Sequence, residues 1–401
     1  MRTMKKNRIL LLLICFGCFM RVTAQGTNVI SLDVKALATT KSRVKAKDLL
    51  IMPAYKQLLK DADKALAFGP VSVMEKKNLP PSGDKHDYTS LAPYHWPDSS
   101  KPGGLPYMRK DGQTNPEVKE YKDKEYMPRL CEEVSTLALA YYFSGNKLYA
   151  EHAARLVKVW FLDTATRMNP NLNFGQAIKG VNTGRGAGMI DTRHFVKLID
   201  AVQLLHSYKA FTVANYKALQ EWFTSFLHWM QTSKVGTDEM KALNNHGAWY
   251  DAQRLSMALF IDSMELAKKI VRNAANRLDK QMDDAGKFPL EMERTTSLHY
   301  TVFVVQAFFN ISQMSEKTGI DLWSYKSPSG KSLKKGFDEL LPYLSQQKKW
   351  EGQQIKEFDF EEGLPLLITG AKKFACTNCK ETIQNIAADK AERLRLNLLN
   401  R

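Results

Sequence analysis

Apolar residues recur every three or four positions along most of the chain, the spacing of helices with one buried face. Between residues 128 and 145, Leu130, Val134 and Tyr141 share one face of a predicted helix that ends at Gly145. The same spacing predicts helices over residues 46–67, 149–161, 191–208, 213–232, 248–264, 266–282, 296–318, 332–347 and 382–399. Helices joined by short links favour an all-α fold of successive antiparallel hairpins.

One segment, residues 71–117, interrupts the helical pattern and is rich in proline and glycine. A loop this long inside a compact domain is usually functional or disordered. Its aromatic residues, including Tyr94, Trp96 and Tyr107, argue against disorder, because disordered segments contain few aromatics. The segment is therefore predicted to form an ordered lid or wall beside a cleft. No linker divides the rest of the chain, so residues 25–401 are predicted to form one domain.

The N-terminus has the pattern of a secretory signal peptide over residues 1–24. Basic residues precede a short apolar run over residues 9–20, and Val22-Thr23-Ala24 forms a small-residue cleavage site. The run is too short to span a bilayer, which takes roughly 20 residues. We therefore expect an exported, periplasmic or secreted protein with no stable membrane span. Cys18 leaves a lipoprotein open as the alternative.

The chain carries a net charge of +16, and removal of residues 1–24 takes away five basic residues and no acid, leaving +11. A basic exported protein can attract an anionic polymer, although composition alone favours a solvated basic surface. No nucleic-acid recognition module stands out, so nucleic acid is not the expected partner.

Three cysteines remain after residue 24, namely Cys131, Cys376 and Cys379. The last two have the spacing of a local disulfide or of two free thiols. A zinc site would need further ligands nearby, but no histidine follows His299. We therefore predict neither a metal nor a cofactor. Cys131 lies on an apolar helix face and is expected to be buried.

Candidate chemistry begins with the run Asn244-Asn245-His246-Gly247. Asparagine is a good helix N-cap and glycine a turn residue, so the run is explained by local structure alone. A helix N-terminus also favours a bound carboxylate. Both interpretations stay open.

About fifty residues later come Arg294, His299 and Tyr300. A tyrosine near the start of an apolar helix is more often a core residue than a catalyst. To act as a base, Tyr300 needs nearby cations that lower its pKa, and Arg294 and His299 are candidates.

Residues 182–188 are rich in glycine and include Arg185, and Arg193 follows shortly after. No strand precedes this turn and no lysine occupies the P-loop position, which excludes a nucleotide site. Arginine suits a sugar carboxylate through bidentate pairing. For Arg193, an ion pair that ties loops together is equally consistent.

Together these side chains supply the groups for removing a proton next to a carboxylate. The carboxylate must be neutralised, a base takes the proton, and an acid protonates the departing oxygen. That describes β-elimination from a uronic acid polymer. Two alternatives remain: a glycoside hydrolase, with carboxylates drawn from Asp283, Asp284, Glu291 and Glu293, and a non-catalytic polyuronate-binding protein.

Four motifs in order resemble those of the helical alginate lyase family. The run Tyr88-Thr89-Ser90-Leu91-Ala92-Pro93-Tyr94-His95-Trp96-Pro97 resembles its opening signature, and Gly184-Arg185-Gly186, Asn244-Asn245-His246 and Arg294 with His299-Tyr300 resemble later ones. The resemblance implies an incomplete (α/α)6–7 toroid with a cleft for 1,4-linked polyuronates. Polysaccharide lyase families five and thirty-eight share this design, and the long loop is closer to the latter. Alginate is the implied substrate, with glucuronan as the alternative.

The resemblance also implies roles for individual residues. Asn245 would neutralise the substrate carboxylate, assisted by Arg294 and His246. Tyr300 would be the acid, and also the base on mannuronate, whereas His246 would be the base on guluronate. The implied substrate-binding residues are Arg185, Gln176, His86, Tyr88, Trp96, Arg193, His299 and Asn244.

Overall fold

A computed structural model describes residues 29–206, 208–209 and 211–400. The predicted signal peptide lies outside these residues. The helices are α1 (Val34–Lys45), α2 (Met52–Ala65), α3 (Lys122–Ser144), α4 (Lys147–Phe161), α5 (Phe195–Leu205), α6 (Val213–Thr232), α7 (Lys234–Met240), α8 (Asn245–Phe260), α9 (Met264–Gln281), α10 (Pro289–Met292), α11 (Ser297–Ser315), α12 (Leu333–Leu344), α13 (Leu364–Lys373), α14 (Cys379–Ala387) and α15 (Leu396–Asn400).

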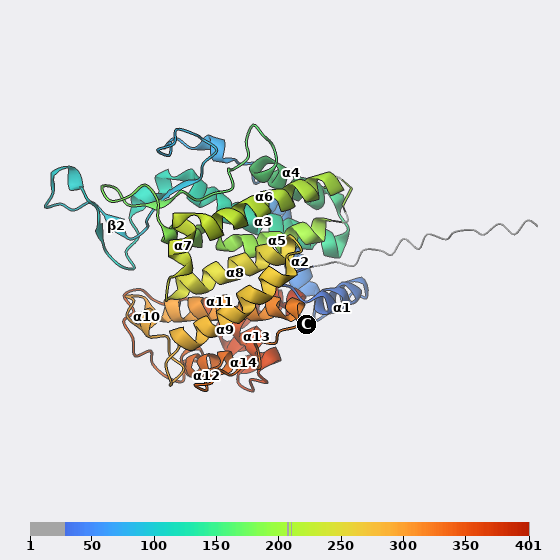
Figure 1. Ribbon diagram of the computed structural model, residues 1–401. Helices are drawn as coiled ribbons and strands as arrows, with labels where there is room; N and C mark the ends of the chain where they lie inside the picture. The colour runs from blue at the N-terminus through green and yellow to red at the C-terminus, as the bar shows by residue number, and fades with distance from the viewer. Residues whose placement is uncertain (1–28, 207, 210, 401) are drawn as a thin grey trace, which may run out of the picture.

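The longer helices form an inner row and an outer row (Figure 1). Each inner helix packs on the next in the order α3, α5, α8, α11 and α13. Helices α4, α6, α9 and α12 pack on the outside of this row, and α2 and α15 lie against its ends. This arrangement confirms the predicted α/α toroid.

Apolar packing holds the two rows together in one continuous cluster of buried side chains. An aromatic group between α4, α5 and α6 belongs to this cluster, with ring centroids 4.8–6.0 Å apart among Phe161, Phe195, Trp222, Phe223 and Phe226. Edge-to-face pairs of this kind add about 0.5–1.5 kcal/mol each beyond burial. The helical body is therefore a rigid support for whatever its ends carry.

Four short strands belong to the segments that cover one end of the helices. Strand β1 (Thr89–Leu91) pairs in parallel with β4 (Phe174–Ala177), and β2 (His95–Trp96) pairs antiparallel with β3 (Met108–Arg109). In Figure 1 the segment with β2 projects beyond the helices on the side where α7 and α10 lie. Residues 71–117 are thus an ordered wall, as their aromatic content predicted.

The helix predictions fail mainly near the termini. The helix expected over residues 46–67 is α2 alone, because the chain turns between α1 and α2, where Lys47 has φ 56°. The helix expected over residues 382–399 is broken into α14, a 3-10 segment and α15. Helix α13 was not predicted at all. Its ten residues are too few for a clear repeat, and Leu364 begins it directly after a 3-10 turn.

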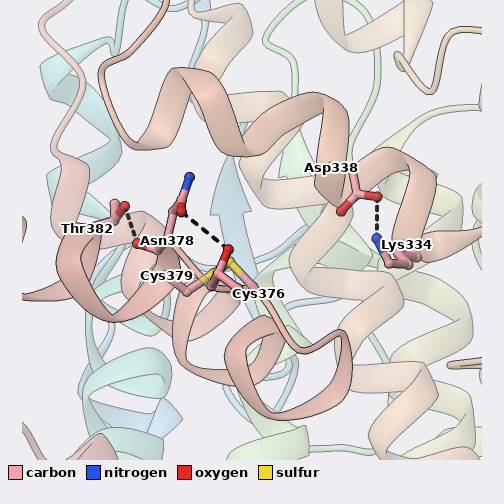
Figure 2. The surroundings of a disulfide bond; sticks show 7 residues. Lys334, Asp338, Cys376, Asn378, Cys379 and Thr382 are labelled. Carbon is pink, nitrogen blue, oxygen red and sulfur yellow. Dashed lines mark hydrogen bonds and ion pairs between the residues drawn. A yellow bond between two sulfur atoms is a disulfide. The ribbon is translucent and has the colours of Figure 1, made fainter.

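Cys376 and Cys379 form a disulfide at the start of α14 (Figure 2). The Thr382 hydroxyl donates to the Asn378 carbonyl at 2.9 Å and supports the same turn. The pairing decides between the two alternatives left open for these thiols. Cys131 is buried, as expected. Among the described helices, none is both long and apolar enough to cross a membrane.

Candidate active site

Three inner helices bring their N-terminal ends to the same edge of the molecule. Asn245 is the first residue of α8, and Tyr300 lies in the first turn of α11, which packs alongside α8. Arg185 precedes a 3-10 segment, Gly186–His194, that leads into α5 and contacts α8. The helix ends therefore gather residues that are more than a hundred positions apart.

Asn245 is held by a buried glutamate. The Asn245 backbone N–H donates to Glu291 Oε1 at 2.5 Å, and its side-chain Nδ2 donates to Glu291 Oε2 at 2.8 Å. Both residues are 1% exposed. The side-chain oxygen of Asn245 is buried with no hydrogen-bond partner among the described residues. Asn244 caps α8 by accepting from the His246 backbone N–H at 3.3 Å, so capping and site formation occur together.

His246 is oriented by a second buried glutamate. Its Nδ1 lies 2.6 Å from Oε1 of Glu239, which is 4% exposed and belongs to α7. A carboxylate accepts hydrogen bonds, so Nδ1 carries the proton and Nε2 keeps its lone pair. The His246 side chain is 21% exposed. The arrangement therefore presents a base at Nε2.

Tyr300 contacts the loop of residues 71–117 through Tyr94. Its hydroxyl donates to the Tyr94 hydroxyl at 2.9 Å, and the Arg294 guanidinium lies 3.6 Å from the centroid of its ring. Burial and Tyr94 raise the pKa of Tyr300, and the opposing charge of Arg294 does not offset them. Arg294 thus lies beside Tyr300, but its charge does not bring the pKa below its ordinary value, so Tyr300 is a protonated acid.

Arg294 is engaged by an acid from the loop. Its Nε and Nη2 donate to the Asp111 carboxylate at 2.6–3.2 Å, and Thr295 donates to the same group through its backbone N–H and its hydroxyl, both at 3.1 Å. Arg109 Nη2 donates to the same carboxylate, 2.7 Å from Oδ1 of Asp111. These bonds hold the pKa of Asp111 well below its usual range, although burial acts in the opposite direction. The ion pair between Arg294 and Asp111 therefore holds the loop against the helices.

A fourth group is organised by Asp191, which is 2% exposed. Its carboxylate accepts from Tyr88 at 3.0 Å, from Ser90 at 2.8 Å and from Gln176 Nε2 at 3.1 Å, and it pairs with Lys124. Gln176 then accepts from Arg185 Nη2 at 3.0 Å. This chain of contacts sets the position of the Arg185 guanidinium.

Arg185 keeps unused donors. Its Nε is buried with no hydrogen-bond partner among the described residues. Burial lowers its pKa, with the nearby Glu239 carboxylate acting in the opposite direction, and guanidinium stays charged at any ordinary pH. Burial and the charges of Arg185 and Arg109 also lower the pKa of His95, on β2, to about 4. The loop therefore faces Arg185 with a neutral imidazole.

Two glycines allow the Arg185 turn to pack directly on strand β4. A Cβ on Gly184 would lie 2.0 Å from the Asn173 carbonyl oxygen, and one on Gly188 would lie 2.6 Å from the backbone of Gly175. No side chain fits at either position. The glycines of this turn therefore allow two backbone segments to approach closely and do not form a P-loop.

The alginate lyase family model matches residues 72–350, which is most of the chain. The chain belongs to the alginate lyase family. It is similar to an alginate lyase from Bacteroides ovatus, with 41% identity over 93% of this chain and 99% of that one, and a TM-score of 0.89. It is therefore a polysaccharide lyase of this family.

More distant structures share the fold. Alginate lyase A1-III from Sphingomonas species A1 is 15% identical over 87% of this chain and 95% of that one, with a TM-score of 0.54. A histidine-to-alanine variant of A1-III, complexed with a tetrasaccharide, is 15% identical over 95% and 97%, with a TM-score of 0.58. A search of curated proteins gives no significant match.

The remaining predicted residues of this lyase occupy varied positions. His86 Nδ1 contacts the Arg167 carbonyl at 2.6 Å, and Trp96 donates to the Gln113 carbonyl at 2.9 Å with Lys110 over its ring. His299 Nδ1 contacts Glu362 at 2.6 Å, and the Arg193 guanidinium lies over Phe303. Tyr88 does not fit its predicted role, because its side chain is fully buried and cannot stack on a sugar.

Several acids of the site were missed as site residues: Asp111, Asp191, Glu239 and, in this role, Glu291. The only sequence signal for Glu239 is its place seven residues before His246, and Asp111 lies 183 residues from its partner Arg294. No sequence spacing predicts such contacts. Among the described residues, no group of histidine, cysteine and acid side chains is arranged to hold a metal ion.

Proposed function

We propose that this protein is an exported lyase that depolymerises alginate by β-elimination, leaving 4,5-unsaturated uronate ends. The single observation that carries the proposal is a series of neighbouring groups at one end of the helices. It runs from His246 and Asn245 past Glu291 to Arg294, Tyr300 and Tyr94. Glu291 binds Asn245, and Arg294 follows Glu291 by three residues and stacks on Tyr300. An acid, a base and a buried amide therefore share one end of the helices.

In the proposed reaction, Asn245 and Arg185 bind the carboxylate of the uronate on the plus side of the scissile bond. Hydrogen bonds and positive charge there stabilise the carbanion that forms when C5 loses its proton. Arg185 suits this role because its Nε has no hydrogen-bond partner among the described residues, whereas Nε and Nη2 of Arg294 donate to Asp111. Arg294 contributes through its charge and by holding the loop.

The proton steps fall to His246 and Tyr300. A base takes the C5 proton, the electron pair forms the C4–C5 double bond, the C4–O bond breaks, and Tyr300 gives its hydroxyl proton to the departing oxygen. His246 Nε2 is the base where the C5 proton and the leaving oxygen lie on opposite faces, as in guluronate. On mannuronate Tyr300 serves as both base and acid: having first lost its own proton to water, the phenolate takes the C5 proton and then gives that proton to the departing oxygen.

Glucuronan is the alternative substrate, since its elimination needs the same groups. Hydrolysis is disfavoured by the positions of the candidate acids: Asp284 and Glu293 are exposed, and Glu291 is buried against Asn245. A retaining or inverting hydrolase needs two carboxyl groups that flank the bond.

A substrate panel tests the proposal. Purified protein is incubated with polymannuronate, polyguluronate, mixed alginate and glucuronan, and the ultraviolet absorbance of unsaturated ends is followed. We expect the absorbance to rise with at least one alginate block. Reducing ends without unsaturation would indicate hydrolysis, and binding without depolymerisation would indicate a binding protein.

Export is part of the same proposal and rests on the N-terminal pattern of residues 1–24. Expression of the full chain in a bacterial host, followed by fractionation and mass spectrometry of the N-terminus, tests it. We expect a mature protein that begins at Gln25 in the periplasm or medium. A lipid-modified Cys18 would indicate a lipoprotein instead.

A further inference from the structure

The buried pair formed by Glu291 and Asn245 presents a conflict of polarity. A substrate carboxylate accepts hydrogen bonds, so Asn245 has to offer it N–H groups. With an ionised Glu291, however, the Asn245 Nδ2 donates to Glu291 at 2.8 Å. The side-chain oxygen of Asn245 is then left buried and without a partner. That oxygen would repel the carboxylate that Asn245 is expected to bind.

A proton on Glu291 removes the conflict if the oxygen and nitrogen of the Asn245 amide exchange places, with no other heavy atom moving. The oxygen and nitrogen of an amide have nearly the same shape, so the amide can turn over in place. A protonated Oε2 then donates to the Asn245 side-chain oxygen across the same 2.8 Å, and Oε1 still accepts the Asn245 backbone N–H at 2.5 Å. Both N–H groups of the amide become free for the substrate.

The surroundings of Glu291 favour this state when substrate binds. Glu291 is 1% exposed, and burial raises its pKa. The hydrogen bonds from Asn245 and the charges of Arg294 and His246 act in the opposite direction, but Asp111 pairs with Arg294 and Glu239 lies against His246. A uronate carboxylate on Asn245 adds a negative charge nearby, and two close carboxylates do not both stay ionised.

We propose that Glu291 is a positioning residue that binds a proton together with the substrate and so turns the amide N–H groups of Asn245 towards the uronate carboxylate. The inference rests on the proposed function, because it requires that Asn245 bind that carboxylate. It adds that polyuronate binding is coupled to uptake of a proton at a residue that never touches the sugar.

Glutamine at position 291 is the matched probe, because its amide mimics the protonated acid. Glu291→Gln can donate Nε2–H to the Asn245 oxygen and accept the backbone N–H at every pH. We expect the ratio of kcat/KM in Glu291→Gln to that in the wild type to rise at least about tenfold from neutral to alkaline pH, where the wild type loses the proton. Glu291→Ala leaves the amide free to rotate and should lose about 100-fold at all pH values.

Proton uptake on substrate binding gives a second readout, which a folding defect would not reproduce. Binding of a uronate tetrasaccharide to Tyr300→Phe, a background chosen to prevent turnover, is measured by calorimetry in buffers of different ionisation enthalpy. We expect uptake of up to about one proton per site, abolished by adding Glu291→Gln. Glu293→Gln is the control, because Glu293 is exposed two residues away, and it should leave both uptake and pH profile unchanged.

The outcomes distinguish a failure of the role proposed for Glu291 from a failure of the proposed function. A constant or falling activity ratio for folded Glu291→Gln, or unchanged proton uptake, overturns the role of Glu291 while the wild type still produces unsaturated ends. A wild type that produces none, or a Tyr300→Phe variant that binds no oligouronate, overturns the proposed function itself.

Discussion

Two walls of the candidate site are built in different ways. The helix wall, formed by Asn245, His246 and Tyr300, belongs to α8 and α11, whose other residues pack in the apolar core. The loop wall, formed by Tyr94, His95, Trp96 and Asp111, belongs to the Pro-rich segment, and polar contacts hold it in place. Apolar packing responds little to pH, whereas hydrogen bonds and ion pairs respond to charge. The helix wall should therefore set the chemistry, and the loop wall should set access to it.

The largest effect is expected from the helix wall at Tyr300. Tyr300→Phe removes the acid and should lower kcat by about 10²–10⁴-fold, measured as formation of unsaturated ends, with the circular dichroism spectrum preserved. Tyr94→Phe on the loop wall removes only the acceptor of the Tyr300 hydroxyl and should cost far less. Equal losses in the two variants would contradict the division between the walls.

His246 and Tyr300 can be told apart by substrate. His246→Gln should reduce cleavage of polyguluronate by about 100-fold or more, because it removes the base for elimination across opposite faces, and should reduce cleavage of polymannuronate less. Rates on the two homopolymers report the ratio directly. If His246→Gln lowers both equally, His246 acts on the carboxylate rather than as the base.

A smaller loss is expected from the glutamate behind His246. Glu239→Gln keeps an acceptor for Nδ1 but removes the charge that stabilises the imidazolium formed during proton abstraction, and should lower kcat by about tenfold with KM little changed. Glu293→Gln, which changes the same charge on the surface, serves as the control. A loss confined to KM would mean that Glu239 acts through Arg185 and substrate binding instead.

Removal of the ion pair between Asp111 and Arg294 tests how the loop wall is held. Asp111→Asn leaves the Arg294 guanidinium, whose side chain is 12% exposed, without a charged partner and should cost about 2–3 kcal/mol of stability. We expect KM to rise more than kcat falls, and protease cleavage within residues 89–115 to become faster. Asp98→Asn, on the same loop, is the matched control, because the Asp98 carboxylate accepts from Ser100 and not from Arg294. An unchanged KM would show that the loop does not govern access.

The smallest expected effect is the response of the ion pairs of the loop to pH. The folded protein lowers the pKa of Asp111 and of Glu117, which binds Tyr107 and Lys179. Lowered values mean that these contacts contribute fully above the unfolded pKa values, about 4, and are lost as the pH falls through the folded values. Protease sensitivity of the loop should therefore be flat from pH 7 to pH 5 and rise only in stronger acid. A rise near pH 6 would assign the transition to other groups.

Sequence reasoning reached the helical fold and a set of candidate site residues for identifiable reasons. Helical periodicity is local, so α4, α6, α9 and α11 were predicted within a few residues of their bounds. Asn245, His246, Arg185 and Tyr300 were found because they lie in short motifs that resemble those of a family. Helix α13 was missed, and the helix predicted over residues 382–399 was wrong, because α13 and α15 are short and depend on contacts with other helices.

The sequence by itself determined which elements form and which side chains can carry chemistry, because both depend on residues close together in the chain. Only the tertiary structure decided how these side chains are used. It buried Tyr88, placed Asp111 on Arg294 across 183 positions, raised the pKa of Tyr300 and set Glu239 and Glu291 behind His246 and Asn245. Burial and charge act through space, and the spacing of residues along the chain does not encode those distances.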